Sequence, residues 1–317
     1  MSFDTTSKSL GVALIDVDHD GWPDVLITND TQPNKLYRNL RNGTFEDTAV
    51  SAGVAFSEDG RARAGMGVDA ADFENSGAAG IAITNFDNEM TAVYRQSRNG
   101  TFSDIALAAG IGKPSKDSLG FGCVFADVNL DGRLDLVEVN GHIDETVRHI
   151  RSNVGYAQPP NLFLNDGRSF RDVAAEAGKG FASPKIARGL ACGDFDRDGD
   201  VDLLITTNQG AAYLYRNDVT SRYRSLRLRL VGTKSNRDAV GAVVRVSTPD
   251  GMQSRMVRTG SSYLSQSELV STVGLGPRAA ADRVVVEWPS GKVQDFRSVG
   301  AGEYELVEGA SIKPLSR

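Results

Sequence analysis

The chain has 317 residues, of which 40% are hydrophobic and 24% charged, and this composition excludes a disordered or fibrous protein. No apolar run approaches the roughly 18 residues that a membrane-spanning helix needs, and two cysteines are too few for a disulfide framework. The net charge of -6 is unevenly distributed, because acidic residues outnumber basic ones up to residue 224 and the reverse holds after it. The acidic first part argues against nucleic acid as the main partner.

An acidic motif of nine residues recurs along the first two thirds of the chain. Its copies begin at Asp16, Asp72, Asp127 and Asp194, with spacings of 56, 55 and 67 residues. An apolar run and a second short strand pattern follow each copy, and in three units a hairpin turn leads into a Phe strand (NGTFED, NGTFSD and DGRSFRD). Phased units of short strands predict an all-β protein whose four visible units are β-propeller blades. A sandwich of unrelated hairpins is the alternative.

Two further segments of the repeat units carry predictions of their own. In three units an Asp at the end of the Phe strand is followed six residues later by Gly, in segments 47–53, 104–110 and 172–178. An Asp N-cap and a Gly C-cap around an Ala-rich stretch predict a single helical turn. The third unit also has a long loop at 141–160, which is either functional or a tolerated excursion into solvent.

The repeated pattern Asp-x-Asp-x-Asp-Gly-x-x-Asp is typical of a loop that binds a hard cation. Alternate carboxylates converge when the chain curls, the glycine permits the sharp turn, and the seventh residue offers a backbone carbonyl. So many carboxylates without a cation would repel one another strongly, and we therefore predict about three Ca²⁺ sites. The predicted ligands are Asp16, Asp18, Asp20, Trp22 and Asp24 in the first loop, Asp127, Asn129, Asp131, Arg133 and Asp135 in the second, and Asp194, Asp196, Asp198, Asp200 and Asp202 in the third.

The unit that begins at Asp72 keeps the repeat but loses most of the ligands. Ser76 stands at its fifth position, and Gly80 stands where the last Asp is expected. We infer that the loop is structural first and metal-binding second, and whether this copy binds metal stays open. Residues 127–138 also match the EF-hand loop. The flanking runs are β-branched and not amphipathic helices, so the EF-hand is the weaker interpretation.

The period stops after residue 217, and from residue 225 the pattern changes to SLRLRLVG, GAVVRVS and DRVVVEWPSG. These alternating or β-branched runs predict a separate small β domain at 225–317, after propeller blades at 1–224. Tyr263, Gln266 and Trp288 in this domain form either a recognition patch or, as is more common for Trp and Tyr, part of the core.

The motif followed by a strand, LYRN and GTF resembles the FG-GAP/VCBS repeat, the blade of integrin-α-like propellers. The resemblance implies calcium-binding loops within the blades and a ring that is usually seven-bladed. Four visible blades are thus either an incomplete seven-bladed ring or a small four-unit propeller. Gly241-Ala242-Val243, the run GSSYLSQS, Gly274-Leu275-Gly276 and WPSG resemble the ASPIC/UnbV domain, which follows such propellers in the cartilage acidic protein family and its bacterial relatives.

These observations predict a calcium-binding, non-catalytic propeller that acts as a protein- or glycan-binding or adhesion module. Calcium sites of extracellular modules are weak, around 10⁻⁴ to 10⁻³ M, which favours an extracellular or periplasmic setting. The first ten residues show no secretory signal, so the chain is either cytoplasmic or lacks its true N-terminus. A hydrolase or lyase that uses the loop 141–160, with His142 or His149 as base and Asp144 or Glu145 beside it, is the alternative. A purely structural assembly module is a third interpretation.

Overall fold

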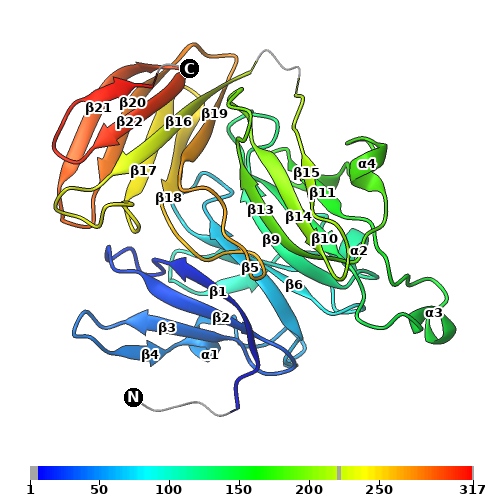
Figure 1. Cartoon of the computed structure of the whole chain (residues 1–317). Helices are drawn as coiled ribbons and strands as arrows, with labels where there is room; N and C mark the ends of the chain where they lie inside the picture. The colour runs from blue at the N-terminus through cyan, green and yellow to red at the C-terminus, as the bar shows by residue number, and fades with distance from the viewer. Residues whose placement is uncertain (1–5, 220–222, 316–317) are drawn as a thin grey trace.

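The computed structural model describes residues 6–219 and 223–315, and its regular structure consists almost entirely of β-strands (Figure 1). Each repeat unit folds into one antiparallel sheet, and we name these sheets blade 1 to blade 4. Within a blade the strands pair in the order of the sequence. The strands are β1 (Ser9–Ile15), β2 (Asp24–Asn29), β3 (Lys35–Asn39) and β4 (Phe45–Asp47) in blade 1; β5 (Gly65–Ala71), β6 (Gly80–Asn85), β7 (Ala92–Gln96) and β8 (Phe102–Asp104) in blade 2; β9 (Gly120–Ala126), β10 (Asp135–Asn140), β11 (Asn161–Asn165) and β12 (Phe170–Asp172) in blade 3; and β13 (Ala187–Gly193), β14 (Asp202–Thr207) and β15 (Tyr213–Tyr215) in blade 4.

The blades pack side by side through their faces, and their first strands line the inside. β1 contacts β5, β5 contacts β9 and β9 contacts β13. A separate hydrophobic cluster fills each contact between neighbouring blades, and Leu26, Ala82 and Val137 belong to the three clusters in turn. These strands form because their β-branched and apolar residues cover a buried sheet face. The predicted propeller blades are confirmed.

Exposed residues at both ends of the row show that the four blades do not close into a ring. Leu204 of blade 4 has the repeat position of Leu26 and Val137, which the following blade covers completely, yet 43% of Leu204 is exposed. At the other end, 47% of Val12 is exposed, whereas its equivalent Val68 is fully buried. The four blades therefore form an open arc, and the closed four-unit alternative does not hold.

An amide side chain at the end of each third strand ties a blade to the one before it. The acceptor is always the backbone carbonyl of the second residue in the motif loop of the preceding blade. The three bonds are Gln96 Nε2 to Val17 O at 2.6 Å, Asn165 Nδ2 to Phe73 O at 2.9 Å and Asn217 Nδ2 to Val128 O at 2.8 Å. The motif loops therefore hold the blades together as well as connecting strands.

The predicted helical turn after the Phe strand is right in one unit of three. Helix α1 (Ala49–Ala52) ends at Gly53, whose φ is 82°, but 104–110 and 172–178 form turns. In all three units the Asp carboxylate accepts the N–H two residues further on, so it closes a turn without capping a helix. The other helices are α2 (Gly112–Ser115), α3 (Val147–Ile150) and α4 (Lys179–Ala182). Among the described residues, no helix is long and apolar enough to cross a membrane.

Two four-stranded sheets at the C-terminus pack around a single core, and we name them the C-terminal sandwich. Their orders are β19-β16-β22-β23 and β18-β17-β20-β21. The strands are β16 (Arg224–Val231), β17 (Val243–Thr248), β18 (Gly251–Met256), β19 (Ser271–Gly276), β20 (Ala280–Glu287), β21 (Val293–Gly300), β22 (Gly302–Val307) and β23 (Ile312–Pro314). Trp288 is buried in this core, and Tyr263 packs against the Phe121 ring. These contacts exclude Trp288 from a recognition patch.

The segment 258–268 of the C-terminal sandwich lies against the inner strands of the blades. Ser262 N donates to Val68 O at 2.7 Å, and Val68 N donates to Ser262 O at 3.1 Å. A Cβ added to Gly122 would lie 2.9 Å from Ser262 Oγ, and one added to Gly189 would lie 2.8 Å from Ser265 Oγ. These glycines stand five residues before the motif Asp of their blades, where a side chain would meet both this segment and neighbouring strands, since a Cβ on Gly122 would also lie 2.7 Å from Leu190 Cβ.

Candidate metal centres

The four motif loops share one backbone conformation, and we number them loop 1 (16–24), loop 2 (72–80), loop 3 (127–135) and loop 4 (194–202). The fourth residue of each loop has a φ between 53° and 61°, and the glycine at the sixth position also has a positive φ. The first carboxylate holds the turn, since Asp16 accepts the N–H groups of Asp20 and Gly21, each at 3.0 Å. The same pair of bonds recurs at Asp72, Asp127 and Asp194.

The last Asp of the motif is buried and joins two strands. Asp24 is 1% exposed and accepts the N–H groups of Val17 at 2.8 Å and Asn39 at 2.7 Å. Asp135 and Asp202 make the same two bonds in their blades. Burial raises the pKa of Asp24 and of Asp202, and it raises that of Asp135 to about 8. A cation beside these carboxylates would favour their ionised form.

Carboxylate oxygens converge in loops 1 and 4. In each loop three side chains offer one oxygen within 4.8 Å of the others: Asp16, Asp18 and Asp24 in loop 1, and Asp194, Asp196 and Asp202 in loop 4. Loop 4 holds a further carboxylate, that of Asp200, which is 5% exposed and whose buried Oδ1 has no hydrogen-bond partner among the described residues. Burial and the neighbouring carboxylates raise the pKa of Asp200 to about 7. Oxygen-only sets of this kind suit hard cations such as Ca²⁺ and Mg²⁺.

The fifth-position carboxylates of loops 1 and 3 are engaged by arginines. Arg41 Nε donates to Asp20 Oδ2 at 2.6 Å, and Arg133 Nη2 donates to Asp131 Oδ2 at 2.7 Å. Sequence reasoning places both aspartates among the ligands, but a cation would have to compete with a guanidinium for each of them. Arg41 lies shortly after the end of β3 and outside the motif, so the motif spacing does not predict its contact with Asp20.

The seventh-position residues, which the sequence assigns as carbonyl ligands, hold the loop through their N–H groups. Trp22 N donates to Asp20 Oδ1 at 2.7 Å, and Asp200 N donates to Asp198 Oδ1 at 3.1 Å. Arg133 N donates to its fifth-position partner in the same way. The carbonyl role of these three residues stays a prediction.

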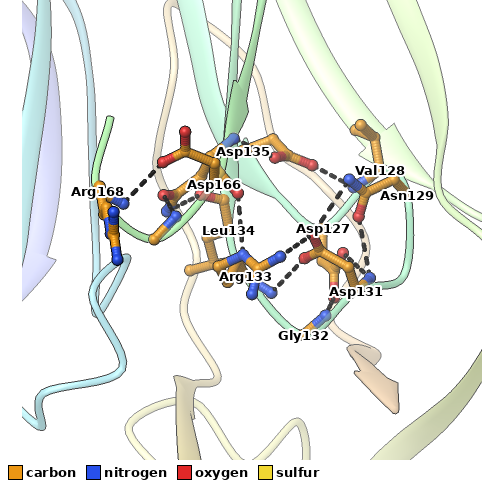
Figure 2. Close-up of polar contacts among 12 residues, drawn as sticks. Asp127, Val128, Asn129, Asp131, Gly132, Arg133, Leu134, Asp135, Asp166 and Arg168 are labelled. Atoms are coloured by element: carbon orange, nitrogen blue, oxygen red, sulfur yellow. Dashed lines mark hydrogen bonds and ion pairs between the residues drawn. The ribbon is translucent and has the colours of Figure 1, made fainter. Parts of the chain in front are cut away.

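Loop 3 differs from loops 1 and 4 by its third residue. Figure 2 shows the carboxylate of Asp127 at the centre of this loop and Asn129 beside Asp131. Asn129 Oδ1 accepts the N–H of Asp131 at 2.9 Å. Burial raises the pKa of Asp127 to about 7, although the nearby Arg255 guanidinium opposes the shift. Among the described residues, groups of three converging carboxylates occur in loops 1 and 4 but not here, because an amide replaces one of the three.

Loop 2 keeps its shape without the ligands because an aromatic ring takes their place. A Cβ added to Gly80 would lie 2.0 Å from the Phe73 ring. Phe73 stacks on Phe125 with ring centroids 5.3 Å apart and touches Phe170 at 5.7 Å. A hydrophobic contact between blades therefore replaces the carboxylate bridge that the last Asp makes in the other three loops.

The C-terminal sandwich covers one side of loop 4, while residues 195–198 of the loop are exposed. Arg227 is 4% exposed, and its Nη1 lies 3.1 Å from Asp194 Oδ2 and 3.0 Å from Glu268 Oε1. Asp194 N donates to the same Glu268 oxygen at 3.1 Å, and Ser225 Oγ donates to Gly199 O. Sequence reasoning missed these residues. The sequence offers no distinguishing signal, because Arg227 alternates with leucines in β16 just as the exposed Arg229 does.

Loop 3 is covered by β19, whereas loop 1 faces solvent. Gly276 N donates to Leu130 O at 2.9 Å, and a Cβ added to Gly274 would lie 2.1 Å from Asp127 Oδ2. The Gly274-Leu275-Gly276 run is thus explained by its close approach to loop 3. In loop 1, His19 is exposed and 48% of Trp22 is exposed, so this loop presents an indole ring beside its carboxylates; loop 4 presents Phe195, of which 53% is exposed.

The long loop 141–160 gives little support to a catalytic interpretation. His142 is 5% exposed, and its Nδ1 accepts the N–H of Asp144 at 2.9 Å. Its ring packs against Phe86, and its Nε2 lies 3.9 Å from Asp87 Oδ1. The lone pair that a general base needs is therefore engaged and buried. His149 is exposed on α3.

Two solved structures of low similarity cover most of the chain. A lectin from Agrocybe aegerita that recognises non-reducing terminal N-acetylglucosamine is 15% identical, with a TM-score of 0.42 over 92% of this chain and 81% of that chain. The V. cholerae biofilm matrix protein Bap1 is 12% identical, with a TM-score of 0.32 over 91% of this chain and 48% of that chain.

The family models and the curated relatives agree on which domains the chain contains. An FG-GAP-like repeat matches residues 16–83, and ASPIC and UnbV matches residues 232–313. Cartilage acidic protein 1 of Xenopus tropicalis is 30% identical over 94% of this chain and 44% of its own length, and that of Mus musculus is 32% identical over 90% and 42%. The chain spans less than half the length of these relatives. It carries an FG-GAP-like repeat followed by an ASPIC/UnbV domain, and it is a distant homologue of cartilage acidic protein 1.

Proposed function

We propose that this protein is a calcium-stabilised, non-catalytic binding module whose ligand is a protein or a glycan. The observation that supports the metal is the convergence of three carboxylates in each of loops 1 and 4. In loop 4 the buried Oδ1 of Asp200, which has no hydrogen-bond partner, adds to it. A buried carboxylate oxygen without a partner is costly, and a bound cation removes that cost.

Ca²⁺ suits these loops better than a transition metal because every side chain on offer supplies oxygen. Calcium takes six to eight oxygens in flexible geometry, and in loop 1 Asp16, Asp18 and Asp24 would hold it. When bound, the ion neutralises the repulsion among these carboxylates. It also stabilises the folded state by mass action, by roughly 3 kcal/mol for a site at a hundred times its Kd.

Loop 1 is the proposed ligand-facing side of the module. Trp22 and His19 are exposed beside its carboxylates, whereas β19 contacts loop 3 and Arg227 pairs with the first carboxylate of loop 4. An exposed Trp gives a large contact area at a small entropic cost, for a sugar ring or for a pocket on a partner protein. Weak calcium sites of this kind suit an extracellular or periplasmic setting, which we propose for the protein.

Thermal unfolding tests the metal. The chain is treated with a chelator, dialysed and scanned with and without 5 mM Ca²⁺, and we expect Tm to rise with calcium and to rise less with Mg²⁺. The double variant Asp24→Asn and Asp202→Asn should lose most of the rise. Asp59→Asn, which alters an exposed acid outside the loops, is the matched control. An unchanged Tm in the unsubstituted chain would contradict the proposal.

Capture from native extract tests the binding role. The immobilised chain should retain a ligand in calcium and release it in chelator, and Trp22→Ala should retain less of it. Glycosidase treatment of the eluate separates a glycan from a protein ligand. Retention that is equal in calcium and in chelator would count against a metal-dependent ligand site.

A further inference from the structure

Blade 4 has no fourth strand among the described residues. In the other three blades the fourth strand reads Phe-x-Asp and pairs with the third strand: Phe45–Asp47, Phe102–Asp104 and Phe170–Asp172. In blade 4, β15 pairs with β14 alone. After Tyr215 the chain leaves for the C-terminal sandwich, which places β15 at the edge of its sheet (Figure 1).

In blades 2 and 3 the fourth strand also packs against the connector that follows the fourth strand of the preceding blade. The backbone oxygen of Phe102 lies 2.8 Å from a Cβ added to Gly53, and that of Phe170 lies 2.5 Å from one added to Gly110. Both glycines end the connector that follows the Phe strand of the blade before. At the equivalent Gly178, after blade 3, no described residue other than its chain neighbours lies within 4 Å of an added Cβ. The place that a fourth strand of blade 4 would take is therefore vacant.

A groove of about 620 Å³ marks this vacant place. Its walls come from the connector of blade 3, from the outer part of blade 3 and from the edge strand β15. They include Val173, Phe181, Leu162, Leu164 and Tyr215. An apolar groove beside an unpaired strand edge is the arrangement that binds an extended peptide by strand addition. It also continues the packed contact between blades 3 and 4.

We propose that this groove binds an extended peptide segment with the sequence Phe-x-Asp, contributed by a partner protein and added to β15 as the fourth strand of blade 4. The groove lies at the position that the chain's own Phe-x-Asp strands occupy in the other blades. Such a segment gains main-chain hydrogen bonds from the strand edge, and its Phe gains a buried apolar site.

The pairing in the other blades sets the register of the bound segment. In blade 2, Phe102 lies opposite Gln96 and Asp104 opposite Tyr94. By the same register the peptide Phe lies opposite Asn217 and the peptide Asp opposite Tyr215. The middle residue then faces Arg216, whose Nε donates to Asp218 Oδ1 at 2.7 Å; an acidic side chain there would share this guanidinium, as Glu46 faces Arg38 in blade 1.

The Asp of the segment has a second donor in the edge strand. Asp104 Oδ1 accepts the N–H of Val93, and Asp172 Oδ1 accepts that of Leu162, each at 3.3 Å. Leu214 has the same position in β15. Its N–H is therefore the expected donor to the peptide carboxylate, and this bond distinguishes Asp from Ala, which has no side-chain acceptor, in the peptide.

A peptide taken from blade 1, NGTFEDTA (residues 42–49), is the probe because its Glu matches Arg216. With a fluorescent label and the full chain, fluorescence anisotropy should show saturable binding with one peptide per chain. Replacing the peptide Phe by Ala should weaken binding at least tenfold, and replacing its Glu by Lys should weaken it about threefold. A scrambled peptide should not bind. Absence of saturable binding by the unscrambled peptide would overturn the proposal.

Two variants locate the site. Ala177→Trp places a large side chain in the groove and should abolish binding. Ser51→Trp, on the connector after blade 1 where Phe102 already fills the place, should leave binding unchanged. Hydrogen exchange should show peptide-dependent protection of 213–215. Equal peptide affinity in Ala177→Trp and the unsubstituted chain, or protection confined to other strands, would refute the assignment. A dimer of the free chain that the peptide dissociates would assign the groove to a second copy and overturn the separate partner.

Discussion

Loops 1 and 4 have the same motif, the same backbone conformation and the same three converging carboxylates, yet they lie in different surroundings. The seventh residue is Trp22 in loop 1, with 48% of it exposed, and Asp200 in loop 4, with 5% exposed. Asp20 of loop 1 pairs with a half-exposed Arg41, whereas Asp194 of loop 4 pairs with the buried Arg227. The motif therefore shapes the loop, and packing decides whether its seventh residue faces solvent or is buried.

The largest difference should appear when each loop loses its arginine. Arg227→Met leaves the buried Asp194 and the part-buried Glu268 without their partner, and we expect the free energy of unfolding to fall by about 3 to 5 kcal/mol. Arg41→Met, the matched change at loop 1, should lower it by less than about 1 kcal/mol because that pair is exposed to solvent. Urea unfolding measures both, and equal losses would show that the cover over loop 4 carries no energetic weight.

The unfolding free energies of variants in loops 1 and 4 must be compared at one pH, because a carboxyl group outside both loops changes its ionisation with pH. Burial raises the pKa of Glu138 from 4.5 to about 7. Its Oε1 has no hydrogen-bond partner, and its Oε2 accepts the hydroxyl of Thr91 at 2.7 Å. The unfolded chain loses this proton near pH 4.5 and the folded chain near pH 7, so the stability from the protonated form is complete below pH 4.5 and declines up to pH 7.

The expected loss between these two pH values is roughly 3 kcal/mol. Glu138→Gln keeps the shape of the side chain and cannot ionise. In chelator, the variant should be more stable than the unsubstituted chain at pH 8 and similar to it at pH 4.5. A pH profile of unfolding free energy that is identical in the two proteins would exclude this assignment.

A smaller effect is expected from the last Asp of each motif, and here the loops should behave alike. Asp24→Asn and Asp202→Asn each turn an acceptor oxygen into an amide that faces a backbone N–H, which costs about 1 to 3 kcal/mol. Calorimetric titration with Ca²⁺ should lose one site in each variant, and the two lost sites should be different. Loss of both sites in one variant would mean that the loops are coupled.

The smallest effect on stability distinguishes the loops by spectroscopy. Trp22→Phe changes an exposed side chain and should alter the free energy of unfolding by no more than about 0.5 kcal/mol. Terbium bound in loop 1 should emit when the neighbouring Trp22 is excited, and the variant should lose this emission while calorimetry still counts the same number of sites. Emission that persists in the variant would place the sensitised ion elsewhere.

Much of this molecule follows from local sequence, because each repeat unit makes its own turns. The positive φ at the sixth position needs Gly21 and its equivalents, and Asp16 closes its turn through bonds to residues four and five positions away. The connectors show the limit of this reasoning. The Asp and Gly signals are the same in three units, but only 49–52 forms a helix, because competing turns differ little in energy when they are so short.

The sequence by itself determined the four repeat units, their strands and the shape of the motif loops. These features depend on contacts within one unit or on the register of its neighbours. Only the tertiary structure decided that the blades form an open arc, that Arg227 and β19 cover loops 4 and 3, and that blade 4 lacks the strand that would fill its groove. Those outcomes depend on contacts between residues far apart in the chain, and the local periodicity contains no information on such long-range contacts.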